Sequence, residues 1–388
     1  MKKVSKILAL LLAVVMVAGA FASCGDSSLE STGTGTLKIG GIGPKTGAAA
    51  QYGIATENGI KLAIKEINEA GGVNGMKLEL NFQDDEHDQQ KAMNAYGVIK
   101  DWGAQLLIGT ITSNPCISVV SLTESDNMFQ LTPSASAVDS IKGPNAFRIC
   151  FSDPNQGAAS AKYIVQNKLA TKVAVIYNNS DPYSNGIYQT FKNEAEVEKL
   201  NIVSEQAFTD ANNTDFSTAI QQIKEAGADL VFLPIYYEQA AMILQQANKA
   251  GLKTKYFGCD GLDGVIAQLG NDKALAEGVM LLTPFAADAK DEKTQKFTAA
   301  YKAEYNGEIP TQFAADGYDA VYTVKAALEK ANVSDASISY SELCDKLVAV
   351  MPEIKVDGVT GTMTWDKAGE PTKEPKAMKI EDGGYKAM

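Results

Sequence analysis

Short apolar runs alternate with amphipathic stretches along most of this chain. The runs 37–42 and 230–233 are too short for helices and end in turn residues, so they are predicted to be strands. Residues 60–67 instead place isoleucine and alanine at helical spacing, and Gly71-Gly72 ends that pattern. The alternation continues almost to the end of the chain. It predicts an α/β protein with parallel sheets.

One part of this pattern carries candidate chemistry. The apolar runs 106–108 and 128–131 each end in small hydroxyl residues, and helical spacing lies between them. A strand–helix–strand unit of this kind brings Ser113, Ser134 and Ser136 to the carboxyl ends of two strands, where small ligands bind. Serine hydroxyls and the free N–H groups of a starting helix suit a carboxylate. The alternative is that these serines only form caps and turns.

The first residues are a targeting segment. Three lysines precede the apolar run 7–21, and small residues precede Cys24. The run is short for a spanning helix and ends like a cleavage site, so residues 1–23 are predicted to be a lipoprotein signal peptide. Cys24 resembles the lipid-modified first residue of bacterial lipoproteins, and 24–36 is expected to be a flexible tether. We therefore expect an extracytoplasmic protein held at the cell membrane by lipid.

The remaining chain is long enough for two lobes. Strand-to-loop transitions place a first crossing between lobes after residue 152, a second at Thr283-Pro284 and a third near Gly358. Lobe 1 is then expected to comprise 37–152 and 284–357, and lobe 2 to comprise 153–283 and 358–388.

Composition excludes several classes of function. The net charge of −12 falls to about −15 without the three leader lysines, which argues against nucleic acid or an anionic membrane face as a partner. The single histidine lies in the acidic loop 84–88, which is better explained as a solvated helix cap than as a metal site. The serines have no candidate base, so we expect no catalysis, no metal and no cofactor. Four cysteines follow Cys24, namely Cys116, Cys150, Cys259 and Cys344. They match no zinc or CxxC spacing, and they could equally form disulfides or stay as buried thiols.

A set of short segments, taken in order, resembles the leucine/isoleucine/valine-binding family of bacterial solute-binding proteins. The segments are Gln51-Tyr52-Gly53, Asp84-Asp85, Leu107-Ile108-Gly109, Leu131-Thr132-Pro133-Ser134-Ala135-Ser136, Phe147-Arg148, Ala250-Gly251-Leu252, Phe257-Gly258 and Gly361-Thr362. The resemblance covers residues 37 to about 380. It implies the type I periplasmic-binding-protein fold, two Rossmann-like lobes joined by a hinge of three crossovers that close on a ligand. It also implies delivery of that ligand to a membrane permease powered by an ATPase.

The same resemblance implies a binding site. Ser113 matches a residue that holds the ligand carboxylate, Ser134 one that offers its carbonyl to the ammonium, and Ser136 a threonine at the head group. Tyr236 and Asp260 match a tyrosine and an acidic residue of the second lobe that face the ammonium. The relative has glutamate at the position of Asp260. The predicted ligand-binding set is Tyr52, Ser113, Ser134, Ala135, Ser136, Tyr183, Tyr236, Asp260 and Phe313. Packing aromatics at Tyr183, Tyr236 and Phe313, and a helix cap at Asp260, are the alternatives.

One departure from the relative is clear. Its disulfide would fall at His87 and Thr112 here, so that bridge is absent. We expect a monomeric substrate-binding lipoprotein of an ABC importer that closes on an amino acid, with leucine, isoleucine or valine as the first candidates. The alternatives are another amino acid, a small amide, or a ligand-sensing module without transport.

Overall fold

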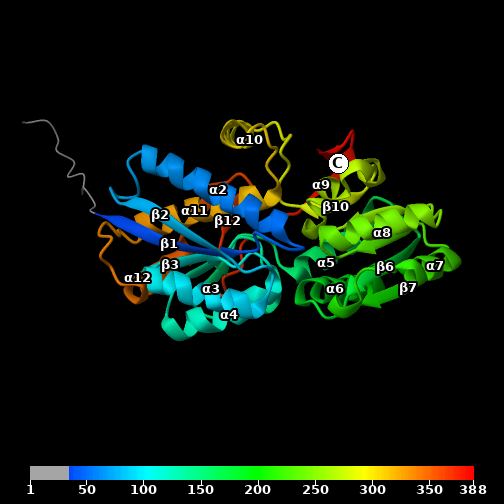
Figure 1. The fold of residues 1–388 in the computed structure, drawn as a ribbon, viewed down its shortest axis with the longest axis horizontal. Coiled ribbons are helices and arrows are strands. Elements are labelled where there is room, and N and C mark those ends of the chain that lie inside the picture. Colours follow the sequence, from blue (N-terminus) through cyan, green and yellow to red (C-terminus); the bar gives the residue numbers. More distant parts are fainter. Residues whose placement is uncertain (1–34) are drawn as a thin grey trace, which may run out of the picture. The chain divides into compact units, whose positions relative to one another are not determined.

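Two sheets organise residues 35–388, which are the residues that this computed structural model describes (Figure 1). The predicted signal peptide, Cys24 and the tether up to residue 34 lie outside the described residues. We call the elements around the five-stranded sheet lobe 1 and those around the seven-stranded sheet lobe 2. Both sheets are built mainly from parallel strands with helices between them, so the predicted α/β class is confirmed.

The sheet of lobe 1 has the order β2-β1-β3-β4-β5 and is parallel throughout. Its strands are β1 (Thr36–Gly43), β2 (Lys77–Asp84), β3 (Leu106–Gly109), β4 (Gln130–Thr132) and β5 (Ala146–Arg148). The helices of this lobe are α2 (Ala50–Glu69), α3 (Gln89–Trp102), α4 (Ser113–Asp126), α10 (Glu292–Glu304), α11 (Gln312–Lys330) and α12 (Tyr340–Val350), with 3₁₀ turns η1 (Val138–Ile141) and η5 (Met351–Glu353). Because β3 and β4 are paired neighbours, the hydroxyl loops that follow them emerge side by side.

The sheet of lobe 2 has the order β14-β13-β10-β9-β8-β6-β7. Its strands are β6 (Lys172–Asn178), β7 (Asn201–Phe208), β8 (Leu230–Leu233), β9 (Lys255–Gly258), β10 (Met280–Thr283), β13 (Lys376–Glu381) and β14 (Gly384–Ala387). Its helices are α5 (Asp153–Gln166), α6 (Pro182–Glu198), α7 (Ser217–Ala226), α8 (Tyr237–Lys249) and α9 (Val265–Leu269), with 3₁₀ turns η2 (Asp210–Asn212), η3 (Asp260–Leu262) and η4 (Gly270–Ala276). The last two strands are antiparallel, and β14 rather than β13 forms the edge.

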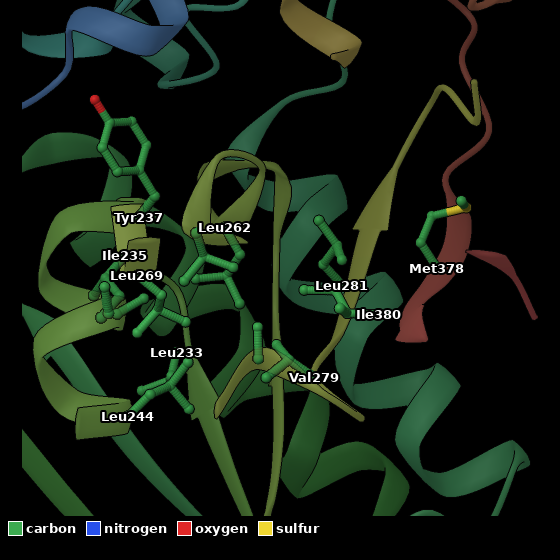
Figure 2. Close-up of a cluster of buried hydrophobic side chains, with 14 of the residues drawn as sticks. Leu233, Ile235, Tyr237, Leu244, Leu262, Leu269, Val279, Leu281, Met378 and Ile380 are labelled. Atoms are coloured by element: carbon green, nitrogen blue, oxygen red, sulfur yellow. The ribbon is translucent and has the colours of Figure 1, made fainter. Parts of the chain in front are cut away.

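A buried apolar cluster holds the strand ends of lobe 2 in place (Figure 2). Leu233, Leu262 and Leu281 converge beneath the loops that follow the strands, and all three are almost fully buried. Tyr237, at the start of α8, belongs to this cluster and extends toward the first lobe, where Gln51 N donates to its hydroxyl at 3.2 Å. The cluster therefore fixes the loops that reach lobe 1.

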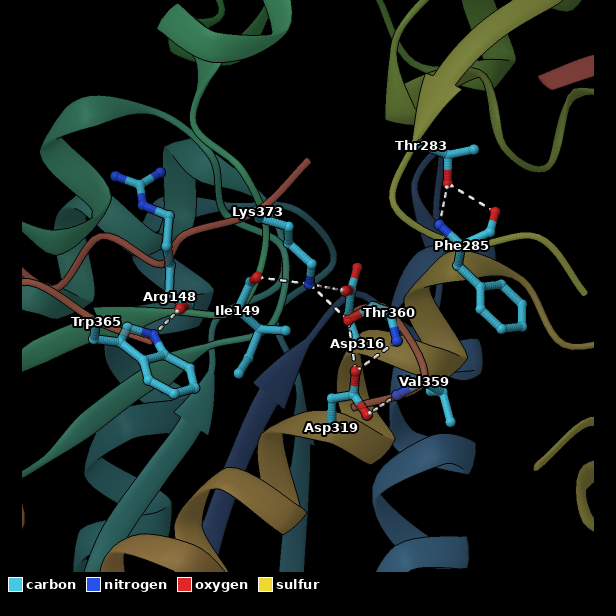
Figure 3. Close-up of polar contacts among 10 residues, drawn as sticks. All are labelled: Arg148, Ile149, Thr283, Phe285, Asp316, Asp319, Val359, Thr360, Trp365 and Lys373. Carbon is cyan, nitrogen blue, oxygen red and sulfur yellow. Dashed lines mark hydrogen bonds and ion pairs between the residues drawn. The ribbon is translucent and has the colours of Figure 1, made fainter. Parts of the chain in front are cut away.

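The expected crossing near Gly358 is wrong. Residues 355–364 form a separate ribbon of β11 (Lys355–Gly358) and β12 (Gly361–Thr364), and the following Trp365 is buried in the core of lobe 1. The indole N–H of Trp365 donates to Arg148 O at 2.7 Å, and Lys373 Nζ donates to Ile149 O at 2.8 Å (Figure 3). Burial of this ribbon against lobe 1 keeps the chain there, so the third crossing follows Lys373.

Buried polar contacts tie this late segment to α11. Lys373 Nζ lies 3.3 Å from Asp316 Oδ1 and donates to Thr360 Oγ1 at 2.7 Å (Figure 3). Asp319 accepts from the N–H groups of Val359 and Thr360, each at 2.9 Å. These contacts satisfy charges that would be costly to bury alone.

The four described cysteines are all buried and none is bonded to another: Cys116, Cys150, Cys259 and Cys344. Of the two alternatives left open by the sequence, the structure shows buried thiols. Within residues 35–388, no helix combines the length and apolar character needed to cross a membrane.

Candidate functional site

A small cavity lies between the lobes at the carboxyl ends of their strands. Its walls are formed by Tyr52, Ile111, Thr112, Ser113, Ser134, Tyr183, Tyr236, Asp260, Gly261 and Phe313. We call it the inner cavity. It brings together all the predicted ligand-binding residues except Ala135 and Ser136.

The lobe 1 wall is made by the two hydroxyl loops. Ser113 is the first residue of α4, and its hydroxyl oxygen accepts from Ala137 N at 3.1 Å. Ser134 Oγ donates to Ile111 O at 2.6 Å, which fastens the second loop to the first. Because Ser113 only accepts in this contact, its hydroxyl proton is free to be donated. Together with the N–H groups of the first turn of α4, it offers hydrogen bonds to an anionic group.

The lobe 2 wall is built around Asp260, which is 2% exposed. It follows β9 and accepts from the Tyr183 hydroxyl at 2.7 Å, while Gly261 N donates to Tyr183 Oη at 2.9 Å. Burial raises the pKa of Asp260 to about 6, against the lowering effect of the hydrogen bonds from Tyr183 and its other neighbours. Tyr236 stacks on Tyr183 with ring centroids 4.7 Å apart. This wall therefore presents a buried carboxyl group whose ionised form a cation would stabilise.

The start of α6 fixes the position of Tyr183. The helix begins at Pro182, a favoured first residue, and Asp181 caps it by accepting from Ser184 N at 3.0 Å. Tyr183 is thus fixed on the first turn of a helix. The Asp181-Pro182 pair is the local sequence signal for this helix start.

Ala135 and Ser136 are not at the cavity wall. The buried guanidinium of Arg148 donates to Ala135 O at 3.2 Å and to Ala137 O at 3.1 Å, which directs this stretch of backbone toward β5. Ser136 is fully buried, and its carbonyl accepts from Asp153 N at 2.9 Å. Arg148 and Asp153 therefore hold this segment behind the wall.

Contacts between the lobes close the inner cavity. The Tyr52 hydroxyl donates to Gly261 O at 2.6 Å and accepts from Tyr237 N at 3.1 Å. Within lobe 1, the Phe313 ring packs against Tyr52 with centroids 4.3 Å apart and supports the tyrosine that makes these contacts. The inner cavity has a volume of only ≈ 10 Å³, counted as the space open to the centre of a water-sized sphere. This is room for about one water molecule. The inner cavity as the structure has it therefore has no room for an organic ligand.

Sequence reasoning missed three residues of the wall. Ile111 and Thr112 lie in the first hydroxyl loop, whose composition was the available signal. Gly261 gave none: a Cβ there would lie 2.6 Å from Tyr183 Oη, so only glycine allows this approach. Thr112 Oγ1 also lies 2.8 Å from His87 Nδ1, so a hydrogen bond joins the two positions at which the relative has its disulfide.

Comparison with known proteins places this geometry in context. The family model described as periplasmic binding protein matches residues 36–384. The leucine-, isoleucine-, valine-, threonine- and alanine-binding protein of Pseudomonas aeruginosa is 28% identical over 373 residues, which cover 95% of this chain and 94% of that protein.

Solved structures agree. The branched-chain amino acid transporter substrate binding protein LivJ from Streptococcus pneumoniae, in complex with isoleucine, has a TM-score of 0.81 and 28% identity, covering 91% of this chain and 98% of that one. A solute binding protein of an ABC transporter from R. palustris, in complex with benzoate, also has a TM-score of 0.81 and covers 91% of this chain and 95% of that one. At 22% identity it shows a shared fold alone.

Proposed function

This chain belongs to the periplasmic binding protein family, whose members are solute-binding proteins and not enzymes, and on that premise we propose that it is the substrate-binding component of an ABC importer for an α-amino acid. The family and the type I fold expected from the sequence are thereby confirmed. The ligand, the transport partners and the anchor are our inference.

The observation that carries the proposal is the division of polar groups between the two walls of the inner cavity. Lobe 1 offers the hydroxyl of Ser113 and the start of α4, which suit a carboxylate. Lobe 2 offers Asp260, which suits an ammonium. An α-amino acid carries both groups on one carbon, and only the closed form satisfies both at once. Binding therefore shifts the open–closed equilibrium toward closure.

Leucine, isoleucine and valine are the first candidates for the side chain. The walls carry an isoleucine and several aromatic rings that suit an aliphatic group, and the relatives from P. aeruginosa and S. pneumoniae are described with such ligands. A benzoate has no ammonium and would leave Asp260 without a partner, so the geometry favours an amino acid over an aromatic acid. Another amino acid, a small amide, or sensing without transport are the remaining alternatives.

We infer an extracytoplasmic monomer anchored through lipid on Cys24. A permease and an ATPase subunit would complete the importer. Uptake of the labelled ligand by cells with and without the gene distinguishes transport from sensing alone. Loss of uptake on deletion supports transport, and unchanged uptake contradicts it.

The ligand class is tested by thermal unfolding of the mature chain, made soluble with Cys24→Ala. Compounds that bind only the folded state raise the unfolding midpoint. The screen contains the common amino acids, small amides, and benzoate as a carboxylate without an ammonium. We expect the largest shift with leucine, isoleucine or valine and none with benzoate. A shift with benzoate or amides alone contradicts the proposal.

A further inference from the structure

A second and larger cavity shares the residue Tyr236 with the inner one. We call it the outer cavity. Its volume is ≈ 370 Å³, within the usual range of small-molecule sites, and residues of both lobes line it. Tyr236 lines both cavities, and the hydrogen bond between His87 and Thr112 joins the wall of one to the wall of the other. An extended ligand side chain that leaves the inner cavity past Tyr236 would therefore enter the outer cavity.

The charges around the outer cavity have one sign. Asp88, Asp181 and Asp210 line it, and no lysine or arginine lines either cavity. His87 does not balance them, because burial lowers the pKa of its imidazole and favours the neutral form. The potential in this cavity therefore favours a cation.

Asp181 distinguishes this site from an ordinary acidic surface. Its carboxylate is 4% exposed, and Oδ2 is used as the cap of α6. The other oxygen, Oδ1, is buried and has no hydrogen-bond partner within residues 35–388. Burial raises the pKa of Asp181 to about 7, and the negative charge of Asp210 contributes to this rise. A buried, unpaired carboxylate oxygen beside a cavity is costly unless a bound group completes it.

The character of the missing partner follows from its surroundings. Within the part of the chain that the structure describes, no group of three or more histidine, cysteine or acidic side chains is arranged to hold a metal ion. The rings of Tyr236 and His87 both line the outer cavity, and their centroids lie 5.4 Å apart in an edge-to-face arrangement. Ring faces and edges suit methylene groups, and the buried Tyr236 hydroxyl has no partner among the described residues. An organic cation on a short aliphatic chain fits these features.

We propose that the outer cavity is a subsite for the cationic end of a basic amino acid, such as lysine or ornithine, whose α-amino and carboxylate groups occupy the inner cavity. The side-chain methylenes pass along Tyr236, and the terminal ammonium donates to Asp181 Oδ1. This inference rests on the proposed function and extends its substrate class beyond aliphatic side chains.

The test compares three ligands and two variants by isothermal titration calorimetry at pH 8, where Asp181 is ionised. The ligands are lysine, norleucine, which is lysine without its terminal ammonium, and leucine. Asp181→Asn removes the charge and keeps the cap, since asparagine is an equally good capping residue. Asp291→Asn is the matched control, because Asp291 caps α10 through Thr294 N and lines neither cavity.

We expect the wild-type protein to bind lysine, and Asp181→Asn to weaken lysine binding by about tenfold or more, as for a lost hydrogen bond to a charged group. Norleucine and leucine should retain their affinity within about twofold. Asp291→Asn should leave all three unchanged.

The outcomes separate this inference from the proposed function. If leucine binds and lysine does not, the subsite is wrong and the amino-acid site stands. If Asp181→Asn weakens leucine and lysine equally, Asp181 does not act on the side chain, and the subsite is again refuted. If no amino acid binds the wild-type protein, both proposals fail.

Discussion

Asp260→Asn should weaken ligand binding and at the same time stabilise the ligand-free protein. The substitution keeps the shape of the side chain and can still accept from Tyr183, which donates to Asp260 at 2.7 Å. It removes only the negative charge. Because a loss of binding through misfolding would lower stability, the opposite signs of the two effects make this variant informative.

The magnitude for stability follows from the position of Asp260. Burial raises its pKa from the ordinary 3.8 to about 6, and a difference of this size corresponds to roughly 3 kcal/mol against the charged form at pH 7. Between those two pH values the folded state holds a proton that the unfolded state has lost. Stability from this group is therefore full below pH 3.8 and declines as pH rises toward 6. The asparagine variant lacks this decline, so its free energy of unfolding at pH 7 should exceed that of the wild type by up to about 3 kcal/mol.

The magnitude for binding follows from the charge lost opposite the ligand ammonium. Truncating one partner of a buried, hydrogen-bonded charge pair costs about 2–5 kcal/mol, which is roughly 30-fold to several thousandfold in Kd. In the wild type, bound ammonium requires ionised Asp260, so affinity should fall by about tenfold for each pH unit below 6. The variant should show no such dependence on Asp260.

Denaturant unfolding and calorimetric titration of both proteins between pH 5 and 8 measure the two effects. Asp263 also has its pKa raised to about 6 by burial and is present in both proteins, so only their difference reports Asp260. Wild-type affinity in Asp260→Asn would show that Asp260 does not face the ammonium. Weaker binding together with lower stability would instead indicate a structural role.

Three further predictions concern other parts of the chain. Lys373→Met should lower the free energy of unfolding by about 3–5 kcal/mol, because it leaves the buried Asp316 without its partner. Combining it with Asp316→Leu should restore much of that stability in the same denaturant assay. Unchanged stability of Lys373→Met alone would show that the ion pair contributes little. Gly261→Ala should weaken ligand binding by at least about tenfold. The added Cβ would lie 2.6 Å from the hydroxyl of Tyr183 and displace this hydroxyl, which donates to Asp260. An unchanged Kd in calorimetry at pH 7 would contradict this. Cys24→Ala should move the protein from the membrane to the soluble fraction on cell fractionation, and continued membrane association would count against lipid attachment.

Local sequence rules predicted much of the fold and the two serines of the lobe 1 wall, Ser113 and Ser134. The apolar run 106–108 and the helical spacing after it lie close to β3 and α4, because short-range patterns determine such elements. The parallel-sheet rule then placed Ser113 beside Ser134, since β3 and β4 are neighbours. Asp260 and Tyr236 came from resemblance alone, because no local pattern marks which loop of lobe 2 faces lobe 1.

The features that sequence did not predict depend on distant partners. Trp365 keeps the late ribbon on lobe 1 by burying in its core and by donating to Arg148 O, 217 positions earlier in the chain, and no signal near Gly358 reports this. Arg148 likewise draws the Ala135 carbonyl away from the cavity. The outer cavity combines loops from both lobes, so its aspartates appear unrelated along the chain.

The late third crossing has a mechanical consequence for opening and closing. Lys373 is fixed to lobe 1 and Lys376 begins β13 of lobe 2, so only Glu374 and Pro375 separate the anchored ends. The proline ring locks one of the few backbone torsion angles available there. This connection is therefore short and stiff. Most of any change in the angle between the lobes must be taken up by the other two connections. Lengthening it with flexible residues would let the lobes twist as well as swing.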